Sequence, residues 1–490
     1  MLHIYDTATQ SLTPLTTRTP GEVSIYVCGP TVYDLPHLGH GRAGLVYDIL
    51  RRYLEYRGFR VHHVSNVTDI DDKIIQKASS EGRSPAEVAS EFEGNWWEAM
   101  DALGILRPTA TPHATDYVEE MIELIEALVE KGVAYRTSTG VYMSVEAVPG
   151  YGLLAHQPLD SLRSGARVSM NEEKHSPLDF ALWKLAKPGE PAWSSPWGMG
   201  RPWWHTECVV MSLGILGEDF DIHAGGMDLQ FPHHENERAQ ALSLSKKFAR
   251  HWIHHAFVEV GGEKMSKSLG NFTSLPDLLQ KYDPRAYRLL VLRSHYRSPM
   301  EVTERTMVDA QEALARLDAL ARRFEIKRGA GRNEPVYGTV ADEPTSPPTD
   351  RISASQEVGE ISSHLPSPSE EGRRRFIERM DDDLDTPGAV AVLFDLVRQA
   401  NTAADSGDLT LARSLVETVE ELSRAVGLDI GDQEEKPDNE IQALVDKRSQ
   451  ARLEKNFVEA DAIREQLSKL GWQVEDTPDG PVLHRKLEHR

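Results

Sequence analysis

The pattern of apolar and polar positions near the start of the chain predicts a strand, a helix and a second strand. Residues 23–28, with the sequence VSIYVC, form a short β-rich run that ends at Gly29. Over 41–59, apolar residues recur three and four positions apart, which is typical of a helix with one buried face. Residues 60–67 form a second β-rich run. Short connections between these elements indicate a parallel sheet with a right-handed crossover.

Four chemically distinctive side chains stand at the ends of these elements. Cys28 and Thr68 follow the two predicted strands, while His37 and His40 stand where the helix is expected to begin. Because open α/β sheets bind ligands at the carboxyl ends of their strands, we expect these side chains along one edge of the sheet. The alternative for the two histidines is a simple turn, since glycine and proline surround them.

The middle of the chain predicts that this α/β domain is split by an insertion. Residues 84–135 have a helical pattern, and a stretch rich in proline, tryptophan and glycine follows at 187–207. Residues 219–245 then predict a strand, a glycine-rich turn and a helix, with Pro232 in the first helical turn. We therefore expect an inserted subdomain at about 110–200.

The second half of the chain is predominantly helical, with one interruption. A helical pattern starts at 304, but residues 327–371 are rich in proline, serine, glycine and glutamate. That composition cannot bury enough apolar surface to offset the entropy of ordering, so it predicts a disordered insertion. Helices resume over 373–427, and residues 437–490 predict two helices and a short hairpin.

Length and charge narrow the class of protein. The chain has 490 residues, which suits several domains, and it contains no apolar run long enough to span a membrane. No basic segment followed by an apolar stretch marks the N-terminus, so we expect a cytoplasmic protein without a membrane partner. The net charge of −23 argues against a protein that coats nucleic acid non-specifically. Local basic patches could still bind a nucleic-acid partner.

Two further features suggest chemistry. The only cysteines are Cys28 and Cys208, which are either inert buried thiols or metal ligands, since a disulfide is not expected in a cytosolic enzyme. The sequence KMSKSLGN at 264–271 places two lysines in a glycine-flanked loop. Lysine ammonium groups suit phosphate oxygens, and a helix N-terminus also favours anions. Alone, the loop could equally be an exposed basic surface.

Together these segments resemble a known family. HLGH at 37–40 and KMSKS at 264–268 are similar to the paired signatures of class I aminoacyl-tRNA synthetases. The surrounding blocks resemble those of the cysteinyl-tRNA synthetase family: YVCGPTVYDLPHLGHGR, NVTDIDDKII, WWHTEC, DIHAGGMDLQFPHHENERAQ, KMSKSLGNF and KNFVEADAIREQL. The resemblance covers nearly the whole chain except 327–371.

The resemblance implies one Zn²⁺ per chain. Its ligands by resemblance are Cys28, Cys208, His233 and Glu237. The residue chemistry is compatible, because thiolate, imidazole and carboxylate all bind zinc, and residues four apart on a helix share one face. The sequence itself does not choose between His233 and His234. Zinc prefers a thiolate to a hydroxyl, so the metal would select cysteine over serine, which an apolar pocket does poorly.

The resemblance also implies the remaining site. His37 and His40 would lie beside the phosphates of ATP, which enters with Mg²⁺, and Lys264 and Lys267 would close from the other side. The other ATP-binding residues by resemblance are Gly39, Gly225 and Gly226. The amino-acid pocket would consist of Gly29, Thr68, Trp204, His223 and Asp228.

The implied protein is a monomeric α/β ligase that acts on L-cysteine, ATP and tRNA(Cys). A Rossmann-like parallel-sheet catalytic domain at 1–303, with its inserted subdomain, would precede an α-helical tRNA-binding domain at 304–432 and a small mixed C-terminal anticodon-recognition domain at 433–490. One alternative is a zinc-dependent ligase that joins cysteine to an amino sugar, but a long helical C-terminal region suits tRNA better. A non-catalytic relative is the other, and it would be expected to lack a signature histidine or lysine; all are present.

Overall fold

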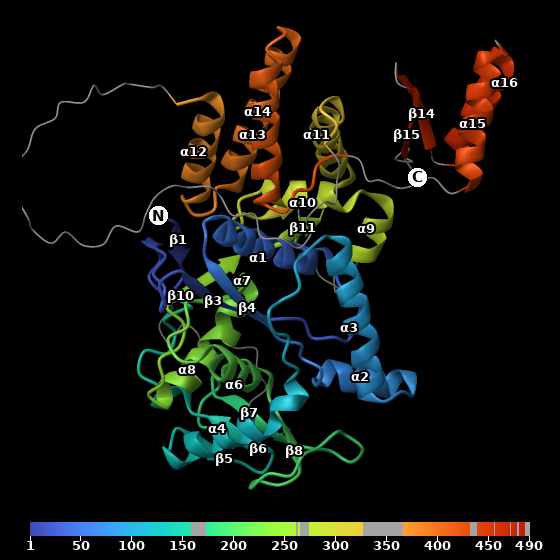
Figure 1. The fold of residues 1–490 in the computed structure, drawn as a ribbon. Coiled ribbons are helices and arrows are strands. Elements are labelled where there is room, and N and C mark those ends of the chain that lie inside the picture. Colours follow the sequence, from blue (N-terminus) through green and yellow to red (C-terminus); the bar gives the residue numbers. More distant parts are fainter. Residues whose placement is uncertain are drawn as a thin grey trace, which may run out of the picture. The chain divides into compact units, whose positions relative to one another are not determined.

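The computed structural model describes most of the chain and divides it into two compact units (Figure 1). One unit contains the described residues of 1–311 and 366–428, and the other contains those of 312–326 and 429–485. The described residues are 1–157, 173–260, 263–264, 274–326, 366–431, 439–454, 456–470, 472–477 and 480–485. The insertion predicted to be disordered therefore lies outside the described residues, apart from its last six positions.

A four-stranded parallel sheet carries the first unit, in the order β10-β9-β3-β4. Its strands are β3 (Glu22–Val27), β4 (Arg60–Ser65), β9 (Ile222–Gly226) and β10 (His251–His255). The two predicted N-terminal strands and their parallel pairing are confirmed. The chain passes from β3 to β4 on one side and returns as β9 on the other. The strand order thus reverses beside β3, and ligands of α/β sheets bind at such a switch point.

Helix α1 (Leu38–Tyr56) connects β3 to β4 and begins at the histidine pair, as the sequence predicts. His37 is its N-cap, and its Nδ1 accepts a 3.2 Å hydrogen bond from the His40 N–H. His40 Nδ1 in turn accepts one of 3.2 Å from the His37 N–H. This reciprocal capping box satisfies two N–H groups at the helix start and fixes both imidazoles.

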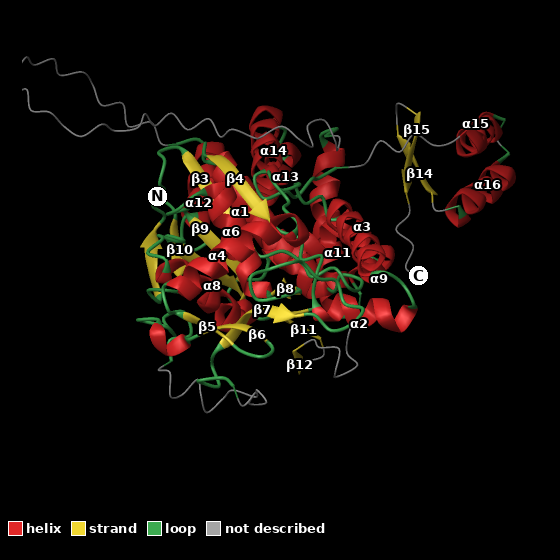
Figure 2. Ribbon diagram, turned by 90° about the horizontal axis from the view of Figure 1, so that it is seen from below, coloured by secondary structure: helices red, strands yellow, loops and turns green. Residues whose placement is uncertain are grey.

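The chain between β4 and β9 adds helices and a second sheet, which is antiparallel. Figure 2 labels its strands β5 to β8. Its elements are α2 (Asp72–Glu81), α3 (Pro85–Ala102), η1 (Ala114–Tyr117), α4 (Val118–Glu130), η2 (Val145–Ala147), α6 (Trp204–Leu216) and the sheet β5 (Ala134–Arg136), β6 (Gly140–Met143), β7 (Phe180–Leu185) and β8 (Gly200–Pro202). This second sheet lies in the region expected to be inserted.

The helical pattern predicted over 84–135 is wrong between α3 and α4. Gly104 has a φ of 67°, a left-handed conformation that ends the helix. The chain that follows is extended beside the central sheet, with Ala110 bridging to Val64 and His113 bridging to Val67. Pairing with a distant strand overrides the local helical pattern there.

The segment after β9 also differs in detail from its prediction. It contains α7 (Met227–Leu229), η3 (Gln230–His234) and α8 (Glu235–Ser243). Pro232 precedes α8 instead of lying in its first turn, because Phe231 has extended backbone angles (φ −142°, ψ 131°) that interrupt the helix. The strand, turn and helix are otherwise confirmed.

The rest of the first unit is mostly helical. Its elements are β1 (His3–Asp6), β2 (Ser11–Pro14), β11 (Val258–Val260), β12 (Glu263–Lys264), α9 (Leu275–Lys281), α10 (Pro284–Leu292), β13 (Met300–Glu301), the start of α11 (Glu304–Arg323), α12 (Pro368–Met380), α13 (Thr386–Asp405) and α14 (Leu409–Arg424). Helix α12 begins before the predicted 373 because Ser367 and Glu370 form a capping box. None of the helices in the described part of the chain has the length and apolar character to cross a bilayer.

The second unit contains the predicted pair of helices and hairpin. Helices α15 (Asn439–Leu453) and α16 (Phe457–Lys469) are followed by the antiparallel strands β14 (Trp472–Thr477) and β15 (Gly480–Arg485). A small core that includes Ile441, Leu467 and Trp472 joins the helices to the hairpin.

Candidate active site and metal centre

Both cysteines meet at the switch point of the sheet. Cys28 directly follows β3, and its N–H donates to the Ala224 carbonyl of β9 at 3.2 Å. Cys208 lies in the first turns of α6, and its Sγ is 3.8 Å from that of Cys28. His233 of η3 and Glu237 of α8 complete a group whose four donor atoms all lie within 4.8 Å of one another. The fold thus brings together two cysteines that are 180 positions apart in the sequence.

The spacing of these donors fits a tetrahedral metal ion. His233 Nε2 lies 3.6 Å from Cys208 Sγ, and Glu237 Oε1 lies 3.6 Å from Cys28 Sγ and 3.0 Å from His233 Nε2. Tetrahedral Zn²⁺ with usual bond lengths separates two sulfurs by about 3.8 Å, sulfur and nitrogen by about 3.5 Å, and nitrogen and oxygen by about 3.3 Å. Two thiolates, an imidazole and a carboxylate at these separations suit zinc in both chemistry and size.

A second group overlaps the first. Cys28, His223, His234 and Glu237 also offer four donor atoms within 4.8 Å of one another. His234 Nε2 is 3.3 Å from Cys28 Sγ, and His223 Nε2 is 2.7 Å from Glu237 Oε2. This group leaves the buried Cys208 outside, whereas the first uses both soft sulfur ligands, so zinc favours the first.

Electrostatics around the cluster favour a bound cation. Burial raises the pKa of the Cys28 thiol, and the adjacent Cys208 raises it further. Burial would also raise the pKa of Glu237, but His223 and His233 outweigh it and hold the pKa at about 2. Burial would lower the pKa of His233, but Glu237 and Cys208 outweigh it and raise the pKa to about 9. The cluster thus combines the Glu237 carboxylate, which is held in its charged form, with the Cys28 thiol, whose proton a bound cation would displace.

Two of the four candidate ligands, His233 and Glu237, also have a partner that orients them. His205 Nδ1 lies 2.7 Å from His233 Nδ1, and His223 holds the outer oxygen of Glu237. Such partners fix the tautomer and direction of metal ligands. The ring of Trp204 stacks on His233 with centroids 4.0 Å apart. His223 and Trp204, expected in the amino-acid pocket, therefore both contact the metal cluster.

The other expected pocket residues lie around the same edge. Thr68 is fully buried beyond β4 and donates to Glu207 Oε1 at 2.5 Å. Gly29 donates its N–H to Asn66 Oδ1 at 2.9 Å, and an added Cβ would lie 1.6 Å from the Asn66 carbonyl oxygen, so only glycine fits. Asp228 is exposed on α7. The sequence reasoning missed Asn66 and Glu207, although both lie inside the recognised blocks.

The expected phosphate-binding residues are described only in part. His37 and His40 are half-buried, and their rings stack with centroids 3.6 Å apart. Gly225 and Gly226 end β9, and an added Cβ on Gly225 would come within 2.9 Å of the His234 ring. Lys264 ends β12, whereas Lys267 lies outside the described residues. Its approach to the histidines stays a prediction.

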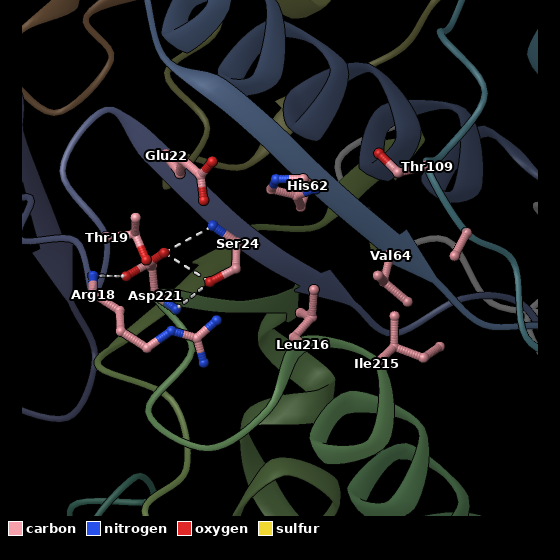
Figure 3. A pocket seen from close by; sticks show the side chains of 11 residues that line it. Arg18, Thr19, Glu22, Ser24, His62, Val64, Thr109, Ile215, Leu216 and Asp221 are labelled. Carbon is pink, nitrogen blue, oxygen red and sulfur yellow. Dashed lines mark hydrogen bonds between the residues drawn. The ribbon is translucent and has the colours of Figure 1, made fainter.

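A cavity of about 230 Å³ lies elsewhere, near the amino ends of the strands (Figure 3). Ser24 of β3 and Asp221, just before β9, line it together with Ile215 and Leu216. The Asp221 carboxylate already accepts hydrogen bonds from the Arg18 N–H at 2.5 Å and from the Ser24 N–H and hydroxyl at 2.8 and 2.7 Å. The carboxylate of Asp221 is thus occupied by donors of the chain itself, and none of the expected site residues in the described part of the chain lines this cavity.

Comparisons with known proteins agree with this site. The tRNA synthetases class I (C) catalytic domain matches residues 14–312, a DALR domain matches 375–430, and a cysteinyl-tRNA ligase anticodon binding domain matches 437–480. The parallel sheet and the first match define the class, that of the class I tRNA synthetases. The cysteine–tRNA ligase of Brevibacillus brevis is 41% identical over 99% of this chain and all of that protein. That of Thermotoga maritima is 44% identical over 94% of this chain and 95% of its own. The chain therefore belongs to the cysteine–tRNA ligase family.

Solved structures share the fold at low identity. Mycobacterium tuberculosis methionyl-tRNA synthetase, in complex with methionyl-adenylate, is 16% identical, with a TM-score of 0.57 over 83% of this chain and 89% of that one. A LeuRS of Agrobacterium radiobacter K84 is 12% identical, with a TM-score of 0.58 over 84% of each chain. The α/β fold class and the family resemblance inferred from the sequence are both confirmed.

Proposed function

We propose that this chain activates L-cysteine with ATP and transfers it to the terminal ribose of tRNA(Cys). The observation that carries this proposal is the cluster of Cys28, Cys208, His233 and Glu237, in a chain of the cysteine–tRNA ligase family whose capped histidine pair begins the helix that follows Cys28. The cysteine carboxylate attacks the α-phosphate, cysteinyl-adenylate forms and pyrophosphate leaves. The acyl group then passes to the ribose hydroxyl and AMP is released.

The chain's own residues position the reactants and stabilise charge, and no covalent nucleophile is required. His37 and His40 face the phosphates from the start of α1, where helix N–H groups favour anions. Lys264 and Lys267 supply cations from the opposite side, and Mg²⁺ accompanies the ATP. Gly39 leaves room for the nucleotide to approach, and the glycines that end β9 let the protein main chain come close to the adenosine.

The four donors described above are proposed to hold one Zn²⁺ per chain. When bound, the ion supplies a site that ranks a thiolate above a hydroxyl, which distinguishes cysteine from serine. Trp204 covers His233, so it is placed to shield the bound side chain from water. Gly29, Thr68, His223 and Asp228 are proposed to line the rest of the pocket.

The matched domains support a tRNA acceptor. We assign 1–303 to catalysis, 304–432 to binding of the tRNA stem and 433–490 to the anticodon, and we expect a monomer in the cytoplasm. Cysteine-dependent exchange of pyrophosphate into ATP tests the first step, with serine as the control substrate. Aminoacylation of purified tRNA(Cys) tests the second. Exchange without aminoacylation, together with transfer of cysteine to an amino sugar, would refute the tRNA assignment.

A further inference from the structure

Arg42 is a buried cation with an unusual set of partners. It lies on α1, two residues after His40, and its side chain is 1% exposed. Within the described residues its hydrogen bonds go to four main-chain carbonyls and to no carboxylate. Burial lowers the pKa of Arg42 only to about 10, so the guanidinium stays charged at neutral pH.

The four carbonyls belong to the two segments that lead into the small sheet β12-β11-β13. Nη1 donates to the Phe257 carbonyl, directly before β11, at 2.6 Å. Nη2 donates to the carbonyls of His295, Tyr296 and Ser298, just before β13, at 3.2, 3.2 and 2.5 Å. One planar group thereby fixes the entry to both strands relative to α1.

This sheet carries a proposed ATP-binding lysine. Strand β11 pairs with β12, and the register places Glu259 opposite Lys264. Glu259 is only two residues beyond the carbonyl of Phe257 that Arg42 holds. The main chain of Lys264 is therefore tied through β11 to the helix that begins with His37 and His40.

Hydrogen-bond satisfaction alone does not explain an arginine here. The Phe257 carbonyl also accepts from the Met300 N–H at 3.0 Å, and the Tyr296 carbonyl accepts from the Ala256 N–H at 2.8 Å. The His295 carbonyl accepts from the Ser298 N–H at 3.0 Å. Most of these acceptors keep a partner without Arg42, and apolar groups of similar volume often replace buried charges without loss of stability.

The other face of the 295–298 turn is fixed independently. Asp383, in the loop between α12 and α13, accepts from the Tyr296 hydroxyl at 2.6 Å and from Arg297 Nε at 2.7 Å. Arg42 and Asp383 thus hold the turn from two sides. If Arg42 is replaced, Asp383 still fixes the turn, and α1 can shift relative to it.

We propose that Arg42 is a positioning residue for adenylate formation, which sets the distance between the histidine pair of α1 and the strand that carries Lys264. The inference rests on the proposed function, in which these groups clasp the phosphates of ATP. A misplacement of about 1 Å can cost about 10²-fold in rate, so the effect should fall on the chemical step.

The test measures single-turnover adenylate formation in R42M, R42K, K264A and the double variant R42M/K264A. We expect R42M to bind zinc and cysteine normally and to melt cooperatively, yet to form adenylate about 10²-fold more slowly. R42M should add little to the loss already present in K264A, because Arg42 acts through that lysine. Y56F is the matched control: it removes a hydrogen bond from the last residue of α1 to Glu421 of α14, which neither Arg42 nor the 295–298 turn contacts in the described residues, and it should leave the rate unchanged.

Several results would overturn the inference. One is an R42M rate within threefold of the wild type, and another is an equal loss from R42M in the wild-type and K264A backgrounds. If R42M does not fold, R42K takes its place in the cycle; failure of both to fold would make Arg42 a stability residue. A wild-type protein without cysteine-dependent exchange would instead refute the proposed function.

Discussion

Substitution of one candidate ligand at a time can decide which of the two donor sets holds the metal. Cys28 and Glu237 belong to both sets, whereas Cys208 belongs only to the first and His234 only to the second. We expect C208S to weaken zinc binding far more than H234Q does, because the separations of the first set match tetrahedral zinc and use both thiolates.

The structure gives the size of each effect. In the first set, His234 is not a ligand but an orienting partner, with Nε2 3.3 Å from Cys28 Sγ. Loss of such a partner typically costs 10–100-fold in metal affinity, so H234Q should fall in that range. Loss of a ligand must cost more, so C208S should weaken zinc by more than about 100-fold. ATP affinity should change little, because Cys208 does not lie at the start of α1.

The assay is competition with a chromophoric chelator, supported by elemental analysis of the purified proteins. C28S serves as the positive control because both sets need Cys28, and a cooperative thermal melt establishes that each variant is folded. Full zinc content in C208S, or a larger loss in H234Q than in C208S, would refute the assignment of Cys208 and His233.

Three further predictions address the loop lysine, the insertion and the helix core. K267A should slow adenylate formation by about 10²–10³-fold while zinc and cysteine binding persist; a normal adenylation rate with failed transfer would contradict this role. Deletion within 327–365 should leave pyrophosphate exchange intact, because no candidate site residue lies there, and loss of exchange in a folded deletion variant would disprove it. D48N should destabilise the protein by about 3–5 kcal/mol in denaturant melts, because buried Asp48 pairs with Arg288 at 2.6 Å and Arg52 at 2.8 Å. Burial would raise the pKa of Asp48, but the two arginines hold it below its usual value; this stabilisation is therefore present above about pH 4 and is lost as the pH falls through the lowered pKa.

Local patterns in the sequence predicted the framework well. The β-rich run before Cys28 and the helical spacing after His40 both depend on near neighbours, and both elements formed as expected. Strand β10 (HWIHH) was not predicted, since three of its five residues are histidines and the segment does not look apolar. In the fold those histidines are buried. His254 Nδ1 lies 2.7 Å from the Thr7 hydroxyl, and its Nε2 lies 2.8 Å from His234 Nδ1. Only the tertiary partners make such a strand stable.

The sequence allowed most residues of the candidate site to be named, but not the contacts between them. Resemblance named the metal ligands, because residue spacing cannot show that Cys28 and Cys208 meet. Asn66 and Glu207 were missed for the same reason, since each becomes significant only through a contact across the site. The residues alone could not choose between His233 and His234, because the two neighbours differ only in their tertiary contacts: His233 reaches Cys208, and His234 reaches Cys28.

The helix that begins with the histidine pair owes its placement to long-range bonds rather than to its own sequence. The Tyr47 hydroxyl donates to the Gly225 carbonyl at 2.6 Å, which ties α1 to the glycine end of β9. The Tyr287 hydroxyl of α10 donates to the Leu38 carbonyl at 2.7 Å and holds the first turn itself. Arg42 adds the link to β11. Two of these bonds, from Tyr47 to β9 and from Arg42 to the start of β11, join α1 to segments of the proposed ATP site, so the position of the histidine pair depends on contacts that the local sequence of α1 does not reveal.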